Sequence, residues 1–182
     1  MKWVVIALLL IVALLAWRVL RPTVRVRVGE PAPEFQLPDQ QGTQHRLTAY
    51  RGRWLVLYFY PRDDTPGCTR EACQFRDDFQ QLQALRAKVA GVSVDTAHSH
   101  ARFAAKYHLP FPLLADTQGA VAAQYGALIK LGPLKMARRI TFIIAPDGRI
   151  AHVCPRVNPD QHALEVTHIL KDLQTRAAAK QA

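Results

Sequence analysis

The chain has 182 residues, and its 24 basic and 14 acidic side chains give a formal net charge of +10. With 49% hydrophobic and 21% charged residues, it suits one globular domain with a short appendage and argues against two domains. Three cysteines are too few for a disulfide scaffold, and the odd number points to redox chemistry. The basic side chains of the domain are scattered and accompany no recognition motif, so we predict no nucleic-acid partner.

The N-terminal 21 residues form a hydrophobic segment. Residues Trp3–Trp17 are apolar without a break, and a helix continued to Leu20 would have 18 residues. Such a helix is about 27 Å long, close to the hydrocarbon thickness of a bilayer. We therefore predict an N-terminal transmembrane anchor at 1–21 and a single-pass protein of the inner (cytoplasmic) membrane. The alternative is a cleaved signal peptide, because Lys2 supplies a charged start, but no clear Ala-x-Ala site follows the run.

The charges that flank this segment bear on the side of the membrane that the domain faces. Arginines at positions 18, 21, 25 and 27 follow the run, against Lys2 before it, which favours a cytoplasmic domain. A signal anchor with so short an N-terminal tail also inserts in the opposite sense, so both sides stay open. Residues 22–33 contain three prolines and are predicted to form an extended linker, which leaves 34–182 as the folded domain.

From residue 34 onward, strand and helix patterns alternate, which predicts an α/β fold with a central sheet. Residues 54–60 form an apolar run of strand length, so they should be a strand buried on both faces. The other expected strands are 35–37 and 45–47 around a turn at 41–42, then 89–94, 113–115, and a hairpin of 140–144 with 150–154. The first expected helix begins at residue 65 and runs to about residue 85, and the others cover 98–107, 119–125 and about 159–180.

A cysteine follows the central strand, within the stretch Phe59–Cys73. Thr65 is a good N-cap for the next helix, because its hydroxyl can accept from free backbone N–H groups, and Pro66 suits the first helical position. Cys68 then lies in the first turn, where unpaired N–H groups and the positive end of the helix dipole favour a thiolate over a thiol. We therefore interpret Cys68 as a nucleophile rather than as an inert buried thiol.

The spacing of Pro61, Thr65 and Cys68 matches the Pro-x-x-x-Thr-x-x-Cys signature of peroxiredoxins. Tyr-Phe-Tyr-Pro surrounds its start, Thr-x-Glu-Ala-x-x-Phe-Arg-Asp follows it, and Cys73 comes five residues after Cys68. In this extended form the chain resembles the bacterioferritin comigratory protein or peroxiredoxin Q branch, over about residues 32–173. The resemblance implies a thioredoxin-like fold with a central mixed β-sheet flanked by helices, in agreement with the order of the expected elements.

The resemblance also implies a thioredoxin-dependent peroxidase that reduces hydrogen peroxide and organic hydroperoxides. Cys68 would be the peroxidatic thiol, Thr65 would contact the peroxide, and Pro61 would close the pocket. Arg139 matches the active-site arginine of the family and would stabilise both the thiolate and the developing oxyanion. Arg138 is the alternative, although strand alternation points it to the opposite face.

Attack on a peroxide leaves a sulfenic acid on Cys68, with which a second thiol must condense. The resemblance implies that Cys73 is the resolving thiol of an intramolecular disulfide, which a thioredoxin-like reductant then reduces. Cys154 is the second candidate, but its late apolar strand is typical of a buried, inert thiol. Three further charges on the same helix either orient the site or pair along the helix, namely Arg70, Glu71 and Arg76.

The histidines show no ligand spacing with the cysteines, so we predict no metal, and we expect no cofactor and a monomeric domain. Two other functions are consistent with parts of the sequence. A membrane-anchored thiol–disulfide oxidoreductase shares the expected fold but favours Cys-x-x-Cys, whereas four residues separate Cys68 from Cys73. A non-enzymatic protein that keeps the fold as a scaffold would have an unreactive Cys68.

Overall fold

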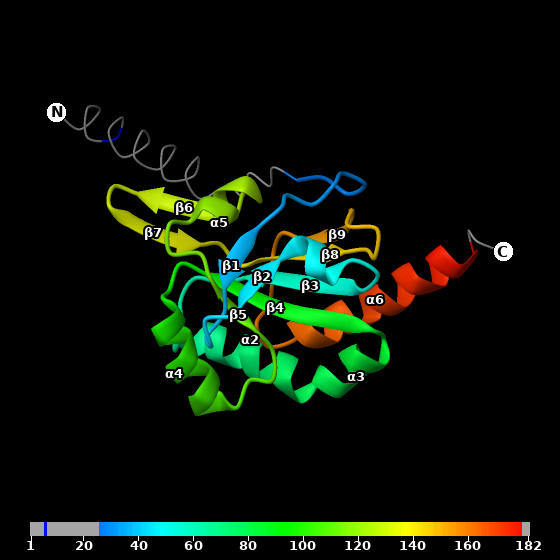
Figure 1. Cartoon of the computed structure of the whole chain (residues 1–182), viewed down its shortest axis with the longest axis horizontal. Helices are drawn as coiled ribbons and strands as arrows, with labels where there is room; N and C mark the ends of the chain where they lie inside the picture. The colour runs from blue at the N-terminus through cyan, green and yellow to red at the C-terminus, as the bar shows by residue number, and fades with distance from the viewer. Residues whose placement is uncertain (1–5, 7–25, 180–182) are drawn as a thin grey trace.

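A five-stranded mixed sheet forms the centre of the molecule (Figure 1). The computed structural model describes residue 6 and residues 26–179, and this sheet has the strand order β5-β4-β3-β8-β9. Its strands are β3 (Trp54–Phe59), β4 (Ala87–Ser93), β5 (Leu113–Ala115), β8 (Ile140–Ile144) and β9 (Ile150–Cys154). β3, β4 and β5 are parallel, whereas β8 runs antiparallel to both β3 and β9. The predicted α/β fold with a central mixed sheet is therefore confirmed.

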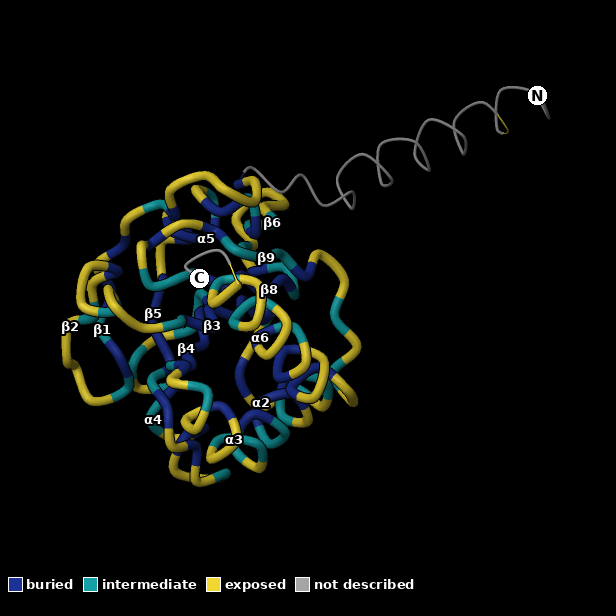
Figure 2. Tube along the Cα trace, turned by 90° about the vertical axis from the view of Figure 1, so that its right-hand side faces the viewer, coloured by how far each residue is buried: buried dark blue, intermediate teal, exposed yellow. Residues whose placement is uncertain are grey.

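β3 is a central strand because its side chains are apolar on both faces. Leu55, Leu57 and Phe59 belong to one hydrophobic core, whereas Val56 and Tyr58 belong to the other. All five are at most 1% exposed, as expected of a strand covered on both faces. Figure 2 shows this burial as dark blue stretches in the middle of the molecule, around β3 and β4. The two cores fix the position of β3, and with it the point where the chain leaves the sheet.

Four helices cover the face of the sheet that carries Val56 (Figure 1). They are α2 (Pro66–Asp77), α3 (Phe79–Ala84), α4 (Ala97–Tyr107) and α6 (His162–Ala179). The opposite face is covered by the hairpin of β1 (Gln36–Pro38) and β2 (Gln44–Arg46), the 3-10 helix η1 (Leu47–Tyr50) and α5 (Ala120–Gln124). Because α2 also contacts α6, the helix that follows β3 packs against both the sheet and the C-terminal helix.

The first long helix differs from the sequence-based expectation. We expected it to run from residue 65 to about residue 85, but it is divided at Asp78 into α2 and α3. The backbone of Asp78, with φ −89° and ψ 6°, lies in the bridge region between helix and strand conformations. The apolar stripe continues across this break through Phe79 and Leu82, so side-chain periodicity gave no sign of it. The C-terminal helix also begins later than expected, at His162.

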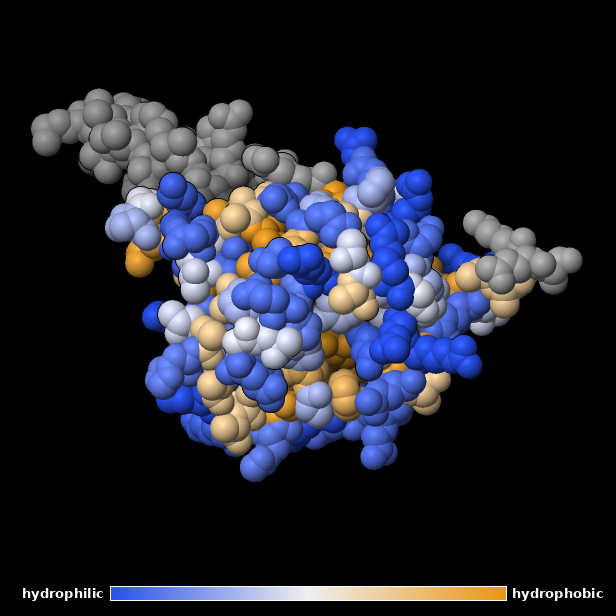
Figure 3. Space-filling model, viewed as in Figure 1, coloured by the Kyte–Doolittle hydropathy of each residue, from blue (hydrophilic) through white to orange (hydrophobic). Residues whose placement is uncertain are grey.

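A second small hairpin was not predicted. β6 (Leu128–Leu131) and β7 (Leu134–Ala137) pair antiparallel around Gly132, whose φ of +58° suits a tight turn. The tip is apolar, with Leu131 65% and Leu134 67% exposed, and apolar side chains lie at this end of the molecular surface (Figure 3). Because its strands do not alternate cleanly between buried and polar residues, the sequence lacks the usual signal for a hairpin.

The predicted transmembrane helix is contradicted. Within residue 6 and residues 26–179, no helix is long and apolar enough to cross a membrane, and the segment 1–21 lies outside the described residues apart from Ile6. The prediction depended on counting past Arg18, because the unbroken run has 15 residues and would make only about 22 Å of helix. The predicted inner-membrane location and the predicted contact with a membrane depended on this helix, so they are contradicted as well.

Residues 26–33, the described part of the expected linker, lie beside β9. The N–H of Gly29 donates to the carbonyl of Ile150 at 2.8 Å, and the N–H of Ile150 donates to the carbonyl of Glu30 at 2.9 Å. The side chains of Val26 and Ala32 are buried against the domain. The boundary between linker and domain at residue 34 stays a prediction.

Candidate active site

The loop between β3 and α2 carries Pro61 and Thr65 at the C-terminal end of the central strand. Thr65 is the N-cap residue of α2, with the extended backbone (φ −85°, ψ 148°) typical of that position, and Pro66 follows as the first helical residue. The Thr65 hydroxyl does not cap the helix, contrary to expectation. It donates to the carbonyl of Arg62 at 3.1 Å, so its oxygen is left to accept a further hydrogen bond.

Cys68 is the third residue of α2 and is 1% exposed. Nη2 of Arg139 donates to its sulfur at 3.2 Å. The sheet brings the two residues together, because Phe59 at the end of β3 pairs with Ile140 at the start of β8, directly after Arg139. The helix N-terminus and the guanidinium therefore act on one buried sulfur, and both stabilise negative charge on it.

Glu71 holds the same guanidinium from the next turn of α2. Nη1 of Arg139 donates to Oε2 of Glu71, whose side chain is fully buried. Burial raises the pKa of Glu71 to about 7, although the charge and the hydrogen bond of Arg139 pull it down. From the sequence, Glu71 was one of three helix charges that either orient the site or pair along the helix. The feature that could have identified Glu71 as a site residue is its spacing of three residues from Cys68, which puts both side chains on one side of a helix.

The free energy of unfolding should depend less on pH when Glu71 is replaced with glutamine. A carboxyl whose pKa rises from 4.5 to about 7 on folding stabilises the fold fully below pH 4.5, and this contribution is lost as the pH rises through 7. The rise corresponds to roughly 3 kcal/mol. Urea titrations at pH 5 and pH 8 measure the free energy of unfolding, which should decrease less between these two pH values in Glu71→Gln than in the unmodified chain. The exposed Glu34 provides a control, since Glu34→Gln should retain the full decrease, and an equal decrease in all three proteins would refute the assignment.

The other two cysteines have different surroundings. Cys73 is half-buried on α2, which runs unbroken from Pro66 to Asp77. Cys154 ends β9, is 3% exposed, and has a pKa that burial raises to about 12. All three cysteines are free thiols in the structure.

The structure thus brings Cys68 and Arg139 into direct contact, with Thr65 at the start of the same helix and Pro61 in the preceding loop. Arg138 donates its backbone N–H to the carbonyl of Ala127 at 2.6 Å, and Arg139 is the arginine bonded to the sulfur. Across residue 6 and residues 26–179, no group of three or more histidine, cysteine, aspartate or glutamate side chains is arranged to hold a metal ion.

A thiol at a helix N-terminus beside an arginine, on an α/β fold with a mixed sheet, is the arrangement expected of an enzyme that uses a cysteine thiolate as its nucleophile. The chain belongs to the AhpC/TSA family, which matches residues 28–153. It is 37% identical over 155 residues to peroxiredoxin Bcp of Bacillus subtilis, an alignment that covers 83% of this chain and 99% of the relative. It is 38% identical over 150 residues to the chloroplastic peroxiredoxin Q of Oryza sativa subsp. japonica, covering 82% of this chain and 69% of the relative.

Solved structures agree with these relatives. The crystal structure of peroxidoxin BcpB from Mycobacterium tuberculosis matches with a TM-score of 0.77 and 38% identity, over 81% of this chain and 98% of that one. The resemblance to the Bcp and peroxiredoxin Q branch and the thioredoxin-like fold are therefore confirmed, and the chain is a thiol-dependent peroxidase. These relatives do not support the alternative of a membrane-anchored thiol–disulfide oxidoreductase.

Proposed function

We propose that this peroxiredoxin reduces hydrogen peroxide and organic hydroperoxides with Cys68 as the peroxidatic thiol, Cys73 as the resolving thiol and a thioredoxin-like protein as the electron donor. The 3.2 Å hydrogen bond from Arg139 to the buried sulfur supports the proposal most directly. A thiolate that attacks peroxide must be stabilised and kept from competing reactions, and this position supplies both conditions. Both thiols, Thr65 and Arg139 lie in one chain, so oxidation of Cys68 and formation of the disulfide need no residue from a second copy.

In the first step, the Cys68 thiolate attacks one oxygen of the peroxide and the O–O bond breaks. The sulfur loses two electrons and becomes a sulfenic acid, while the other oxygen takes a proton and leaves as water or an alcohol. The Thr65 hydroxyl donates its proton to the hydrogen bond with the Arg62 carbonyl. Its oxygen therefore accepts a hydrogen bond from the O–H of the peroxide and aligns the O–O bond. Arg139 stabilises the leaving oxyanion, and Pro61 stiffens the loop that shields the sulfur.

In the second step, the Cys73 thiol condenses with the sulfenic acid, releases water and leaves an intramolecular disulfide. On an intact α-helix, residues five apart have Cα atoms roughly 8.7 Å from each other. A disulfide tolerates at most about 7 Å between Cα atoms. Because α2 is continuous past both thiols, it must unwind between Cys68 and Cys73 before the disulfide can form.

The contacts of α2 with the C-terminal region support a limit to this unwinding. Arg70 pairs with Asp160 at 2.7 Å, but both side chains are more than half exposed, so the pair contributes at most about 1 kcal/mol. Phe75, in contrast, is fully buried, and its ring packs edge-on against His162 with the centroids 5.5 Å apart. We infer that the first turns of α2 unwind, whereas the segment from Phe75 onward stays folded.

In the third step, a thioredoxin-like dithiol attacks the disulfide, returns both cysteines to thiols and becomes oxidised itself. An assay with thioredoxin, thioredoxin reductase and NADPH should therefore show peroxide-dependent oxidation of NADPH. A parallel assay with glutathione and glutaredoxin supplies a second class of donor for comparison. Turnover with glutaredoxin but not with thioredoxin would reject the proposed donor while leaving the peroxidase activity intact.

The backbone amides of residues 69–75 should exchange with solvent faster in the disulfide form than in the thiol form. The reason is that the disulfide removes the helical hydrogen bonds that protect these amides. Hydrogen exchange followed by mass spectrometry in both redox states measures the difference. Cys73→Ser should keep the protection of the thiol form after peroxide treatment, whereas Cys154→Ser should show the full change. Equal protection in both redox states would rule out an unwinding helix.

A further inference from the structure

We propose that His100 is a positioning residue for peroxide reduction, which holds the carboxylate of Asp63 and so fixes the loop that carries Thr65. The inference rests on the roles proposed above for Thr65 and Cys68. It concerns α4, whereas the side chain that hydrogen-bonds to the sulfur, that of Arg139, comes from outside this helix. α4 would then be part of the catalytic architecture rather than only a cover for the sheet.

Asp63 is buried in the loop, and several hydrogen bonds converge on its carboxylate. Nδ1 of His100 lies 2.9 Å from Oδ2 and 3.1 Å from Oδ1, and the hydroxyl of Tyr60 donates to Oδ1 at 2.8 Å. Burial works to raise the pKa of Asp63, but its hydrogen bonds, that of His100 first, bring the pKa below its usual value. The carboxylate is therefore a charged acceptor at neutral pH, and charge-assisted hydrogen bonds of this kind are stronger than neutral ones.

The polar contacts of His100 are directed at this loop. The residue is fully buried, and its Nδ1 must carry a proton to bond to the facing carboxylate. Apart from Asp63, Nδ1 has the Tyr60 hydroxyl at 3.3 Å, whereas Nε2 has no hydrogen-bond partner within the described part of the chain. Burying an imidazole with one nitrogen unpaired is unfavourable, so the bond made by the other nitrogen accounts for a histidine in this place.

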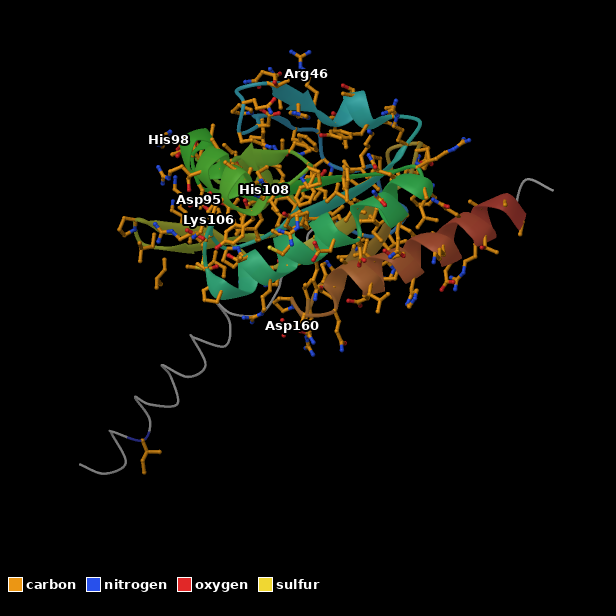
Figure 4. All side chains as sticks on the ribbon, turned by 90° about the horizontal axis from the view of Figure 1, so that it is seen from below. Arg46, Asp95, His98, Lys106, His108 and Asp160 are labelled. Atoms are coloured by element: carbon orange, nitrogen blue, oxygen red, sulfur yellow. The ribbon has the colours of Figure 1, made fainter. Side chains whose placement is uncertain are left out.

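α4 also binds the next residue of the loop. Asp64 has a φ of +58°, which is uncommon for residues other than glycine. Lys106 donates to both of its carboxylate oxygens, at 2.8 and 3.0 Å, and the Tyr107 hydroxyl donates to Oδ1 at 2.9 Å. Figure 4 labels Lys106 together with Asp95, the residue whose carboxylate accepts from the N–H of Asp63. Because the Lys106 pair is about half exposed, the buried contact of His100 is the stronger restraint on the loop.

One peptide group connects Asp63 to Thr65. The N–H of Asp63 donates to Oδ2 of Asp95 at 2.9 Å, and the carbonyl of the same peptide group, that of Arg62, accepts the Thr65 hydroxyl at 3.1 Å. His100 holds the side chain of Asp63, the residue whose N–H belongs to this peptide group. Loss of the His100 imidazole therefore allows the peptide group to rotate, and the Thr65 hydroxyl turns away with the carbonyl. Displacing a positioning group by about 1 Å can slow a reaction by roughly 100-fold.

The test compares His100→Leu, His100→Asn and His98→Leu in the full chain. Leucine keeps the volume of His100 but lacks the donor, asparagine places an N–H donor near the position of Nδ1, and His98 is an exposed histidine on the same helix. Two rates are measured at the same pH, namely oxidation of Cys68 by hydrogen peroxide and its alkylation by iodoacetamide. Alkylation requires the thiolate but not Thr65, so only the peroxide reaction reports on the position of the loop.

His100→Leu should slow oxidation by roughly tenfold or more and leave alkylation nearly unchanged. His100→Asn should recover most of the peroxide rate, and His98→Leu should not differ from the unmodified chain. If both reactions slowed equally in His100→Leu, or if asparagine were as slow as leucine, His100 would have a packing role and the proposal would be overturned. An unchanged peroxide rate in His100→Leu would overturn it as well.

Asp63→Asn provides a second route if His100→Leu does not fold. It keeps the shape of the side chain but weakens the acceptor, so the peroxide rate should again fall selectively. If alkylation slowed as much as oxidation in Asp63→Asn, or if neither changed, the proposal would be overturned. Where His100→Leu folds, adding it to Asp63→Asn should cause no further loss, because the two residues act through one contact, whereas additive losses would reject the link. If peroxide did not oxidise Cys68 in the unmodified chain, the proposed function would fail independently of His100.

Discussion

Replacing Cys68 with serine should abolish peroxide turnover, because a serine hydroxyl is not ionised at neutral pH and cannot form a sulfenic acid. Cys154→Ser should leave turnover nearly unchanged. Cys154 lies buried at the end of β9, and burial raises its pKa to about 12, so this sulfur stays a poorly nucleophilic thiol at neutral pH. Consumption of NADPH in the thioredoxin-coupled assay measures turnover in both variants.

Cys73→Ser separates the first step of the cycle from the second. Cys68 is intact in this variant, so one equivalent of peroxide should still be consumed, but no intramolecular disulfide should follow. Mass spectrometry should then find Cys68 first as the sulfenic acid and, with excess peroxide, as the sulfinic acid. A folded Cys154→Ser variant without turnover would instead make Cys154 the resolving thiol, the alternative left open by the sequence.

The start of α2 could be predicted because its determinants are local. The apolar run of β3, the Thr65-Pro66 pair and the position of Cys68 follow one another along the chain within one short stretch. Arg139 was chosen because it matches the active-site arginine of the family, and the alternation of side chains along a strand was only a second argument against Arg138. Arg139 makes the bond to the sulfur, but both arginines lie between β7 and β8 rather than on a strand.

Features that depend on distant contacts could not be predicted in this way. The Thr65 hydroxyl bonds to the Arg62 carbonyl instead of capping the helix, and either bond would satisfy a threonine at this position. His100 is 37 positions from Asp63, and only the packing of α4 beside the loop brings them together. The raised pKa of Glu71 arises from burial by several elements, which no single segment encodes.

The hydrophobic N-terminal segment shows a different limit of prediction from sequence, that of an argument from composition. Its apolar composition favoured a membrane anchor, but the apolar run was of marginal length and the prediction had to count past Arg18. Composition alone does not distinguish an anchor from other short apolar segments of this length. The signature around Cys68 was more reliable, because it combined spacing, a helix cap and a strand within one stretch.

Replacing Arg139 with methionine should slow the attack of Cys68 on peroxide by roughly 10- to 100-fold. Methionine fills much of the same space but donates no hydrogen bond to the sulfur or to the leaving oxygen. A hydrogen bond to a charged group contributes about 1.5–3 kcal/mol, and each 1.4 kcal/mol corresponds to about a tenfold change in rate. The Arg139 side chain is 19% exposed, so water screens its charge only weakly. Stopped-flow oxidation by hydrogen peroxide gives the rate, and the rate of alkylation at one fixed pH should fall as well.

Two further variants separate the charge of Arg139 from its geometry. Arg138→Met removes the neighbouring arginine and should leave the peroxide rate close to that of the unmodified chain, because Arg139 makes the bond to the sulfur. Arg139→Lys keeps a positive charge, but one ammonium cannot reproduce a fork that reaches Glu71 through Nη1 and Cys68 through Nη2. It should therefore restore part of the alkylation rate and little of the peroxide rate. If Arg139→Met reacted with both reagents like the unmodified chain, the cation that stabilises the Cys68 thiolate would have to lie elsewhere.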